Sequence, residues 1–375
     1  MSGNGCSHPD DAASRPAPST FRAPAAYAAS RAAIWLAANA LFTDAHGRAL
    51  IVDPDYRTTS LLPGGAVEAG ESPSAAAARE VREEIGLELE FRRCLAIDWN
   101  PPRASEHDPA VRIPAQIVQV MDGGTLSEDQ IRSIRPDHEI TRTHWAEPAA
   151  LARHMGGRSA RRTLAALRAR INGAGAAILE DGYPTAPTLL DRLEALSRPR
   201  TPERWTWHPV PVPAGVPITQ CRGWLFAPDG RVVALMDRET GALSLPGGPL
   251  EHEDHGDPAA TLIRQALAQA RITVLDPVFP PYLGHLDTTA HGAAREAHVR
   301  MAAVIASHAP VPAASPGTSP GTAVLATPEQ VAELVDWGPD AARQLDAVHR
   351  ARADLNLPRA ARRPITELAL DGTPP

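Results

Sequence analysis

A repeated tetrapeptide constrains the fold of this chain more than any other sequence feature. Leu62-Pro63-Gly64-Gly65 recurs as Leu245-Pro246-Gly247-Gly248, at an offset of 183 residues (248 − 65). Two shorter matches precede it at nearly the same spacing, namely Gly47-Arg48 with Gly230-Arg231 (offset 183) and Leu41-Phe42 with Leu225-Phe226 (offset 184). Near-constant spacing over three separate segments indicates a duplication. We therefore expect two related domains within the 375 residues.

The composition narrows the class of protein. Hydrophobic residues make up 43% and charged residues 22%, as in soluble globular proteins. The net charge of −7, without a basic segment or a helix-turn-helix pattern, disfavours a DNA-binding role. The three cysteines lie far apart and suit neither disulfides nor a zinc site. Neither a secretory signal nor a membrane-spanning apolar stretch is evident, so we expect a cytoplasmic protein without a membrane partner.

Composition shifts along the chain divide it into five parts. These are a disordered arm at 1–28, a first domain at 29–156, a helical linker at 157–204, a second domain at 205–355 and a tail at 356–375. The first domain opens with apolar runs at 34–42 and 49–52 around a glycine-containing turn, which predicts a hairpin. In the second domain, the segment 307–321 is rich in Pro, Ala, Ser and Gly, which predicts a flexible loop.

Local signals predict a helix over residues 73–85. Ser72 is a good N-cap, and Pro73 stands at the first helical position, where its missing N–H costs nothing. Four alanines and a run of Arg and Glu favour the helix, and Gly86 supplies its end.

Three glutamates share one face of this expected helix. Glu80, Glu83 and Glu84 stand at positions i, i+3 and i+4, where like charges repel each other. A divalent cation would relieve that repulsion, and a set of oxygen ligands suits Mg²⁺ or Mn²⁺. The glycine-rich loop before the helix allows the backbone to approach both the ion and a phosphate.

The stretch 65–87 resembles the signature of the Nudix hydrolases. Every fixed position of that signature is matched, by Gly65, Glu71, Arg79, Glu80, Val81, Glu83, Glu84, Gly86 and Leu87. The resemblance implies an α/β/α sandwich around a mixed, curved sheet. It also implies an enzyme that uses Mg²⁺ or Mn²⁺ to hydrolyse the pyrophosphate bond of a nucleoside diphosphate linked to another moiety.

The resemblance also implies roles for individual residues. Glu80 and Glu84 would bind the metal directly, and Gly65 would lend it a carbonyl oxygen. Glu83 would hold a further ion, or orient and deprotonate the attacking water.

Two further groups complete the implied site. Arg79 and Glu71 would form a salt bridge that braces the loop against the helix. Family members often supply one more carboxylate from a loop before the last strand, and Glu139 occupies that place as an auxiliary base or ligand. His138 and His144, beside it, are read as ordinary residues of the strand edge.

The substrate is left open among ADP-ribose, a nucleotide sugar, a dinucleoside polyphosphate and a damaged nucleoside triphosphate. Pro102 lies about fifteen residues after the signature, where some ADP-ribose-hydrolysing relatives carry a proline. Trp99 could stack on a nucleobase, but we expect it in the core. A regulatory module that binds nucleotides without turnover is the alternative to an enzyme, and the intact carboxylates favour the enzyme.

The second copy departs from the signature. Gly248 and Arg264 are retained, whereas the three carboxylates are replaced by Gln265, Ala268 and Gln269. Glutamine and alanine neither bind Mg²⁺ tightly nor accept a proton. We therefore expect a degenerate domain without catalytic power. Its role is left open between binding a ligand, shaping the first site and forming a homodimer surface.

Overall fold

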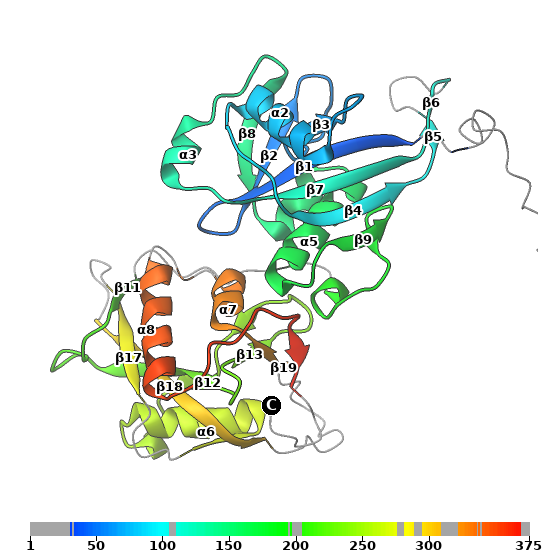
Figure 1. Ribbon diagram of the computed structural model, residues 1–375. Helices are drawn as coiled ribbons and strands as arrows, with labels where there is room; N and C mark the ends of the chain where they lie inside the picture. The colour runs from blue at the N-terminus through cyan, green and yellow to red at the C-terminus, as the bar shows by residue number, and fades with distance from the viewer. Residues whose placement is uncertain are drawn as a thin grey trace, which may run out of the picture. The chain divides into compact units, whose positions relative to one another are not determined.

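The protein is described by a computed structural model that covers residues 31, 34–104, 110–193, 196, 205–275, 281–288, 295–308, 322–335, 337 and 340–368. The expected arm at 1–28 and positions 309–321 of the expected loop lie outside these residues. The described elements form two mixed sheets (Figure 1). We call residues 35–184 the N-terminal lobe and residues 205–368 the C-terminal lobe, and we describe each by itself.

The N-terminal lobe contains one sheet with the order β10-β9-β4-β7-β1-β2-β8, and β3 pairs with β1. Its strands are β1 (Trp35–Thr43), β2 (Ala49–Pro54), β3 (Gly64–Ala66), β4 (Cys94–Asn100), β7 (Gln116–Thr125), β8 (Ile140–Ala146), β9 (Ala177–Glu180) and β10 (Tyr183–Pro184). A separate ribbon is formed by β5 (Arg103–Ala104) and β6 (Arg112–Ile113). β1 runs parallel to β7 and antiparallel to β2, so the expected hairpin at 34–52 is present in a mixed sheet.

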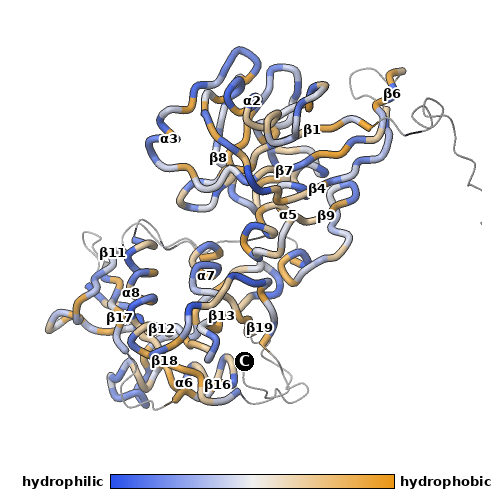
Figure 2. Tube along the Cα trace, in the orientation of Figure 1, coloured by the Kyte–Doolittle hydropathy of each residue, from blue (hydrophilic) through white to orange (hydrophobic). Residues whose placement is uncertain are grey.

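Helices cover both faces of this sheet. They are α2 (Pro73–Ile85), α3 (Glu128–Ser133), α4 (Leu151–His154) and α5 (Gly157–Asn172), with a 3₁₀ turn at Pro148–Ala150. Ala38, Ala40 and Phe42 of β1 pack with α2, whereas Leu41 lies in the cluster that includes Leu167 of α5. This alternation puts α2 and α5 on opposite faces of the sheet (Figure 1). Hydrophobic positions recur along the central strands, as Figure 2 shows.

The segment 157–204, expected to be a linker, contributes to the first sheet. It begins with α5, and β9 and β10 then add two strands beside β4. A 3₁₀ turn at Leu190–Arg192 follows β10. The expected tail at 356–375 is likewise packed over its described part, because Ile365 is 2% and Leu368 3% exposed. Between them, β20 (Thr366–Glu367) pairs with β19.

The C-terminal lobe has the sheet order β11-β17-β18-β12-β13-β19-β20. Its strands are β11 (Trp205–His208), β12 (Ile218–Phe226), β13 (Val232–Met236), β14 (Leu243–Ser244), β15 (Gly247–Pro249), β16 (Ile272–Val274), β17 (Tyr282–Thr288), β18 (Ala297–His308), β19 (Thr322–Ala326) and β20. Its helices are α6 (Pro258–Ala270), α7 (Pro328–Leu334) and α8 (Ala341–Asp354), with a 3₁₀ turn at His252–Asp254. One apolar cluster joins α6 to the sheet, and another joins α7 and α8 to it.

The two lobes repeat one topology. The strand order β4-β7-β1-β2-β8 corresponds to β17-β18-β12-β13-β19. Each lobe has a single parallel pair in this set, β1 with β7 and β12 with β18, and the other neighbours are antiparallel. A short strand and then a helix, β3 and α2 or β15 and α6, follow in the same relation. The described strands of this set therefore have the same order and relative directions in both lobes, and the duplication stays a prediction from the sequence.

Glycine is required at the same place in both lobes. Gly64 has φ +135, and a Cβ there would lie 2.3 Å from the carbonyl oxygen of Ala38. Gly247 has φ +140, and its Cβ would lie 2.2 Å from the carbonyl oxygen of Cys221. No side chain fits so close to a backbone atom, so glycine alone lets the short strand pair with its neighbour here.

Candidate active site

Helix α2 holds the three glutamates at the edge of the N-terminal lobe. Ser72 Oγ accepts a hydrogen bond from the Ala75 N–H at 3.2 Å, and Gly86 ends the helix with φ 74. The expected bounds of 73–85 are those observed. The buried residues of the helix are Ala76, Ala77, Val81 and Ile85. Since these occupy the face packed on the sheet, the glutamates are left on the remaining surface of α2.

Arg79 braces the signature loop. Its Nε lies 3.1 Å from Glu71 Oε1 and its Nη2 3.0 Å from Glu71 Oε2, so the expected salt bridge is present. The same Nη2 donates to the carbonyl oxygen of Ala66 at 3.0 Å. The hydrogen bonds from Arg79 hold the pKa of Glu71 below its usual value. The hydrogen bonds to Glu71 and Ala66 fix the loop to α2, while Nη1 of the same guanidinium group donates to Glu80 at 2.8 Å.

Glu80 and Glu84 lie against the two glycines of the loop. The Gly64 N–H donates to Glu84 Oε2 at 2.7 Å. A Cβ on Gly65 would lie only 2.5 Å from Glu80 Oε1, so the Glu80 carboxylate is in direct contact with that glycine. Both glutamates are only partly exposed. The loop and the helix therefore bring two carboxylates and the backbone of residues 64–65 into one small volume.

Burial dominates the electrostatics of this pair. Burial raises the pKa of Glu84 to about 8, and the charges of Glu80, Asp137 and Glu139 act in the same direction. Burial also raises the pKa of Glu80, partly offset by the hydrogen bond from Arg79. Carboxylates that are hard to ionise because they are buried together are stabilised in their charged form by a cation.

Glu83 lies further out. Its side chain is 51% exposed, and its carboxylate lies 3.2 Å from Arg79 Nη1. Glu83 precedes Glu84 in the helix, and its side chain lies on the solvent side of Glu80 and Glu84.

The loop before β8 brings Glu139 to this site. The N–H of Arg135 donates to the Ile85 carbonyl at 2.9 Å, and that of Asp137 to the Glu84 carbonyl at 3.2 Å, so the loop is attached to the end of α2. Asp137 Oδ1 in turn accepts the Glu139 N–H at 3.0 Å. The Glu139 carboxylate is 60% exposed and close enough to raise the pKa of Glu84.

Two neighbours of the site were not singled out from the sequence. Asp137 helps to raise the pKa of Glu84 and shapes the loop that carries Glu139. Tyr56, in the turn after β2, is 55% exposed. Burial of its hydroxyl and the charges of Glu84, Glu139 and Glu80 raise its pKa. The signal in the sequence that could have identified Tyr56 was an aromatic residue in the turn that follows β2 and precedes the signature.

The expectation that Trp99 belongs to the core is wrong. Trp99 is 42% exposed, whereas its neighbours Asp98 and Asn100 are 0% and 2% exposed. Asp98 is buried because Arg162 of α5 donates to it at 2.7 Å. Alternation along β4 therefore turns Trp99 to the other face of the sheet, the face that α2 covers further along. Ile117, opposite Trp99, and Leu36, opposite Ile117, lie beside it.

The brace is kept in the C-terminal lobe. Arg264 donates to Asp254 at 2.9 and 2.7 Å and to the Pro249 carbonyl at 3.4 Å, as Arg79 does to Glu71 and Ala66. The sequence comparison missed this partner, although Asp254 follows Gly248 by the same six residues as Glu71 follows Gly65.

The carboxylates, by contrast, have been exchanged for an amide. Gln269 Oε1 accepts the Gly247 N–H at 2.9 Å, and Gln269 Nε2 donates to the Gly247 carbonyl at 3.0 Å. A neutral side chain thus closes the loop that Glu84 closes in the first lobe. Arg222 and Arg300, paired across β12 and β18, lie near this loop instead of Asn39 and Val120.

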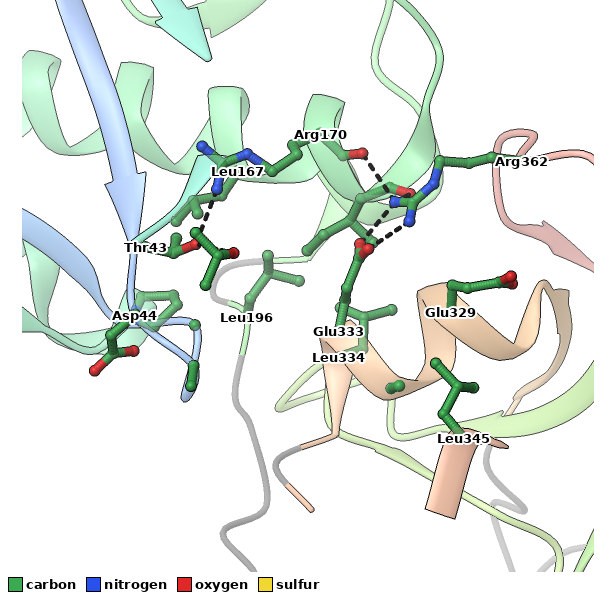
Figure 3. A pocket seen from close by; sticks show the side chains of 16 residues that line it. Thr43, Asp44, Leu167, Arg170, Leu196, Glu329, Glu333, Leu334, Leu345 and Arg362 are labelled. Carbon is green, nitrogen blue, oxygen red and sulfur yellow. Dashed lines mark hydrogen bonds and ion pairs between the residues drawn. The ribbon is translucent and has the colours of Figure 1, made fainter. Parts of the chain in front are cut away.

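A cavity of about 370 Å³ lies apart from Glu80, Glu83 and Glu84 (Figure 3). It is lined by side chains of β1, α5, α7 and the C-terminal segment, including Thr43, Arg170, Glu333 and Arg362. Arg170 donates to Thr43 Oγ1 at 3.0 Å, and Arg362 donates to the Arg170 carbonyl at 3.2 Å and to Glu333 at 2.7 Å. Its lining contains no residue of the signature, so we assign it no part in hydrolysis.

Comparison with known families gives the class of protein. Residues 34–167 match the sequence model of the NUDIX domain. This stretch includes β1 to most of α5 and every carboxylate of the site described above. Residues 34–167 of the N-terminal lobe therefore contain a NUDIX domain, in agreement with the signature.

Several solved structures are similar to part of this chain. A NUDIX hydrolase from Nitrosomonas europaea is 17% identical, with 39% of this chain and 78% of that chain covered and a TM-score of 0.30. An ADP-ribose pyrophosphatase from Streptococcus suis is 21% identical, with coverage of 40% and 99% and a TM-score of 0.28. The E. coli dihydroneopterin triphosphate pyrophosphohydrolase is 18% identical, with coverage of 34% and 90% and a TM-score of 0.28.

The comparison with curated proteins gave no match. Among the residues that the structure describes, no helix has the length and apolar character needed to cross a membrane.

Proposed function

We propose that the N-terminal lobe hydrolyses the pyrophosphate bond of a nucleoside diphosphate linked to another moiety, with Mg²⁺ or Mn²⁺ as cofactor. One observation carries this proposal. Glu80 and Glu84 lie half-buried against the Gly64–Gly65 backbone, with the pKa of both raised by burial. A cluster of this kind, at the edge of a sheet and beside a glycine loop, fits a hard cation and a phosphate.

The donor atoms fit the cation. Glu80 and Glu84 offer carboxylate oxygens beside the Gly64–Gly65 backbone, and the Gly65 carbonyl is the backbone donor that the resemblance implies. Oxygen-only donors prefer Mg²⁺ or Mn²⁺ over softer metals. When bound, such an ion would neutralise the diphosphate and make the attacked phosphorus more electrophilic.

Glu83 and Glu139 are the two proton acceptors that we propose for the attacking water. Both carboxylates are more than half exposed, at 51% and 60%, so either can pass the proton on to solvent. They reach the site from different elements, Glu83 from α2 and Glu139 from the loop before β8. Replacing each by glutamine separates their contributions, because the amide keeps the shape and cannot accept the proton.

Arg79 acts as a positioning residue. Its guanidinium group is occupied by Glu71, Ala66 and Glu80. Removal of this fork would release the loop from α2, so we expect Arg79→Lys to impair turnover by moving the Gly64–Gly65 backbone.

The exposed surface around Trp99 supports a nucleoside-binding role. Trp99, Ile117 and Leu36 form a contiguous apolar row on the face of the sheet that also carries α2. An exposed tryptophan there can stack on a base, which contributes about 1–3 kcal/mol. ADP-ribose is the first nucleotide to test, because Pro102 stands where some ADP-ribose-hydrolysing relatives carry a proline.

The C-terminal lobe lacks the means for the same reaction. Gln265, Ala268 and Gln269 replace the carboxylates, and Gln269 is fully engaged with Gly247. We propose that this lobe is a degenerate, non-catalytic copy that folds with the same brace. Binding of a small molecule or a second copy of the chain is the role that we propose to test for it. The absence of a DNA-binding role and a cytoplasmic location remain part of the proposal.

A substrate panel tests the function. The full chain with Mg²⁺ or Mn²⁺ should release a nucleoside monophosphate, phosphate or pyrophosphate from ADP-ribose, a nucleotide sugar, a dinucleoside polyphosphate or a nucleoside triphosphate. Product identification by chromatography distinguishes hydrolysis from the alternative, a regulatory module that binds nucleotides without turnover. Saturable binding without any product, for the whole panel and both metals, would favour that alternative.

A further inference from the structure

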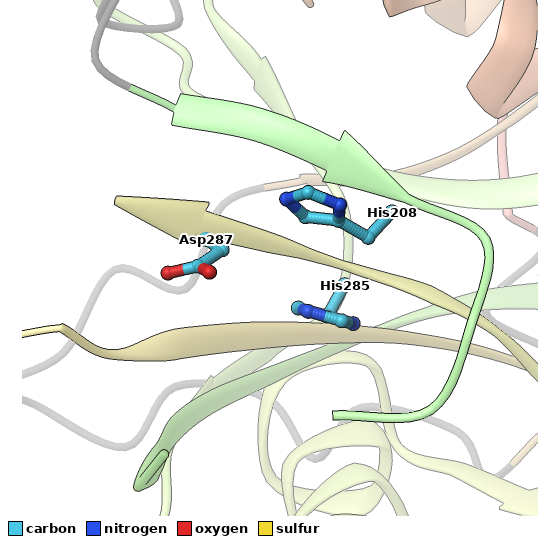
Figure 4. A group of neighbouring side chains, drawn as sticks. All are labelled: His208, His285 and Asp287. Carbon is cyan, nitrogen blue, oxygen red and sulfur yellow. The ribbon is translucent and has the colours of Figure 1, made fainter. Parts of the chain in front are cut away.

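Three polar side chains of the C-terminal lobe converge on one face of its sheet. His208 of β11 lies directly opposite His285 of β17, and Asp287 follows two residues later on the same side of β17. Since side chains alternate along a strand, His285 and Asp287 share one face, and the cross-strand partner His208 faces them (Figure 4). One ligand atom from each residue lies within 4.8 Å of the other two.

Three atoms of this group are buried without a hydrogen-bond partner among the described residues. They are Nε2 of His208, Nε2 of His285 and Oδ1 of Asp287. His285 and Asp287 are each only 1% exposed. Buried polar atoms are almost always paired, so three unpaired atoms at one point indicate a missing ligand.

The surrounding contacts prepare these atoms for a cation. His285 Nδ1 lies 3.0 Å from the Val210 carbonyl and 2.9 Å from the Tyr282 hydroxyl, which itself donates to that carbonyl at 2.9 Å. A proton on Nδ1 suits both neighbours and leaves a lone pair on Nε2. Asp287 Oδ2 receives Arg295 Nε at 2.7 Å, which fixes the carboxylate and leaves Oδ1 free for another partner. Such outer contacts are typical of metal ligands.

We propose that His208, His285 and Asp287 form a binding site for one divalent transition-metal ion, of which Zn²⁺ is the reference case. Two imidazoles and one carboxylate form a donor set of intermediate softness, which favours Zn²⁺, Co²⁺ or Ni²⁺ over Mg²⁺. The ion would connect the edge strand β11 to β17. The remaining coordination position is open to water.

Binding requires a small movement of the rings. Two ligand atoms at about 2.0 Å from one ion in tetrahedral geometry stand about 3.3 Å apart. The ligand atoms here lie within 4.8 Å of one another, and the two imidazole rings are nearly parallel, with an angle of 26° and centroids 5.1 Å apart. Rotation of the half-buried His208 side chain is the smallest change that brings its Nε2 toward the other two atoms.

The proposed ion is independent of the cation at Glu80 and Glu84. That site has only oxygen donors and belongs to the other lobe, so an excess of Mg²⁺ is expected to occupy it and to leave the histidine site to Zn²⁺. Metal binding can then be measured without any assay of hydrolysis.

The experiment measures Zn²⁺ binding to the full chain in excess Mg²⁺, after removal of metals with a chelator and dialysis. Competition against a chromophoric chelator should give one Zn²⁺ per chain. His208→Gln and Asp287→Asn should each weaken this binding by about 100-fold. His252→Gln, at an exposed histidine in another part of the same lobe, is the matched control and should leave it unchanged.

Co²⁺ provides a readout that does not depend on variants that fold. In the wild-type chain, bound Co²⁺ should show the strong visible absorption of a tetrahedral complex with nitrogen ligands, and Zn²⁺ should remove it. The proposal is overturned by any of three results: no stoichiometric Zn²⁺ binding by the wild type, equal affinity in His208→Gln, or equal loss in His252→Gln. Circular dichroism verifies that each variant is folded, and an unfolded variant leaves the Co²⁺ spectrum of the wild type to decide.

Discussion

Replacing Glu84 by glutamine should stabilise the metal-free protein while it abolishes turnover. The C-terminal lobe already contains the expected geometry of this variant. Gln269 accepts the N–H of Gly247 and donates to its carbonyl, at 2.9 and 3.0 Å. Glu84 accepts the equivalent N–H of Gly64 at 2.7 Å, and in its ionised form it has no proton to donate to the carbonyl. Glutamine at position 84 is therefore expected to fit and to add one hydrogen bond.

The magnitude follows from the raised pKa of Glu84, about 8 in the folded chain against 4.5 for an ordinary glutamate. Between these values the folded state holds a proton that the unfolded state has released. The free energy of unfolding therefore falls as the pH rises, by about 1.4 kcal/mol per pH unit at most. The full window gives an upper limit of about 5 kcal/mol, and partial access of water to the side chain reduces it to about 1–3 kcal/mol.

The assay is thermal unfolding in a chelator at pH values from 5 to 9. The Glu84→Gln variant should melt at a higher temperature than the wild type above pH 5. The difference should grow to roughly 3–10 °C near pH 8 and then level off. Saturating Mg²⁺ should raise the melting temperature of the wild type more than that of the variant. The hydrolysis rate of the variant should fall by about 10²–10⁴-fold.

Glu83→Gln is the matched control, because Glu83 is half exposed on the same helix. It should lower the rate without changing the pH dependence of melting. The reasoning about burial is refuted if Glu84→Gln and the wild type show the same pH dependence in the chelator. The assignment of Glu84 to the metal site is refuted if the variant hydrolyses substrate at the wild-type rate.

The remaining predictions concern groups around the site. Mg²⁺ binding should release about one proton per chain near pH 6.5 and none above pH 9, because the ion displaces the proton of Glu84. Calorimetry in buffers of different ionisation enthalpy measures this release, and a binding enthalpy that does not depend on the buffer would contradict the prediction. Trp99→Ala should raise KM about 5- to 100-fold with kcat nearly unchanged if the indole stacks on the base; an unchanged KM in steady-state kinetics would remove it from the binding site. Glu139→Gln should lower kcat by 10-fold or more if its carboxylate accepts the proton, and an unaltered pH–rate profile would leave that role to Glu83. Gln265→Ala should leave kcat within about twofold of the wild type, and loss of turnover in the same assay would show that the C-terminal lobe takes part in the chemistry.

The elements that local signals determine were predictable from the sequence. The helix at 73–85 has its cap, its proline and its terminal glycine in the chain itself, and the structure has the same bounds. The salt bridge of Arg79 with Glu71 was expected from the resemblance to the Nudix signature, and it is present at 3.0 Å.

Features that depend on distant segments were not predictable in the same way. Alternation shows that Trp99 and Asp98 point to opposite faces of β4, but it does not show which face a helix covers. The buried partner of Asp98 is Arg162, 64 residues away on α5. Asp98 is therefore buried with Arg162, and Trp99, the next residue of the strand, lies on the other face and is exposed. This is the reverse of the usual preference, in which aspartate is exposed and tryptophan is buried.

The same limit applies to the segments between and after the two domains. Residues 177–184 have no strong strand pattern, yet they add β9 and β10 to the first sheet through pairing with β4. Ile365 and Leu368 are isolated apolar residues in a polar tail, and they become buried because β19 offers an edge for β20. His208 and His285 are 77 residues apart in the chain and meet only through the register of β11 with β17.

The tetrapeptide shared by the two lobes is required by backbone crowding and does not depend on the carboxylates of the helix that follows it. At Gly64 and Gly247 any side chain would overlap the neighbouring strand, whether or not a carboxylate stands on the following helix. The same lead-in therefore stands before a helix that carries Glu80, Glu83 and Glu84 and before a helix that carries Gln265, Ala268 and Gln269. A search that relies on this lead-in alone would not distinguish a segment with the three glutamates from one without them.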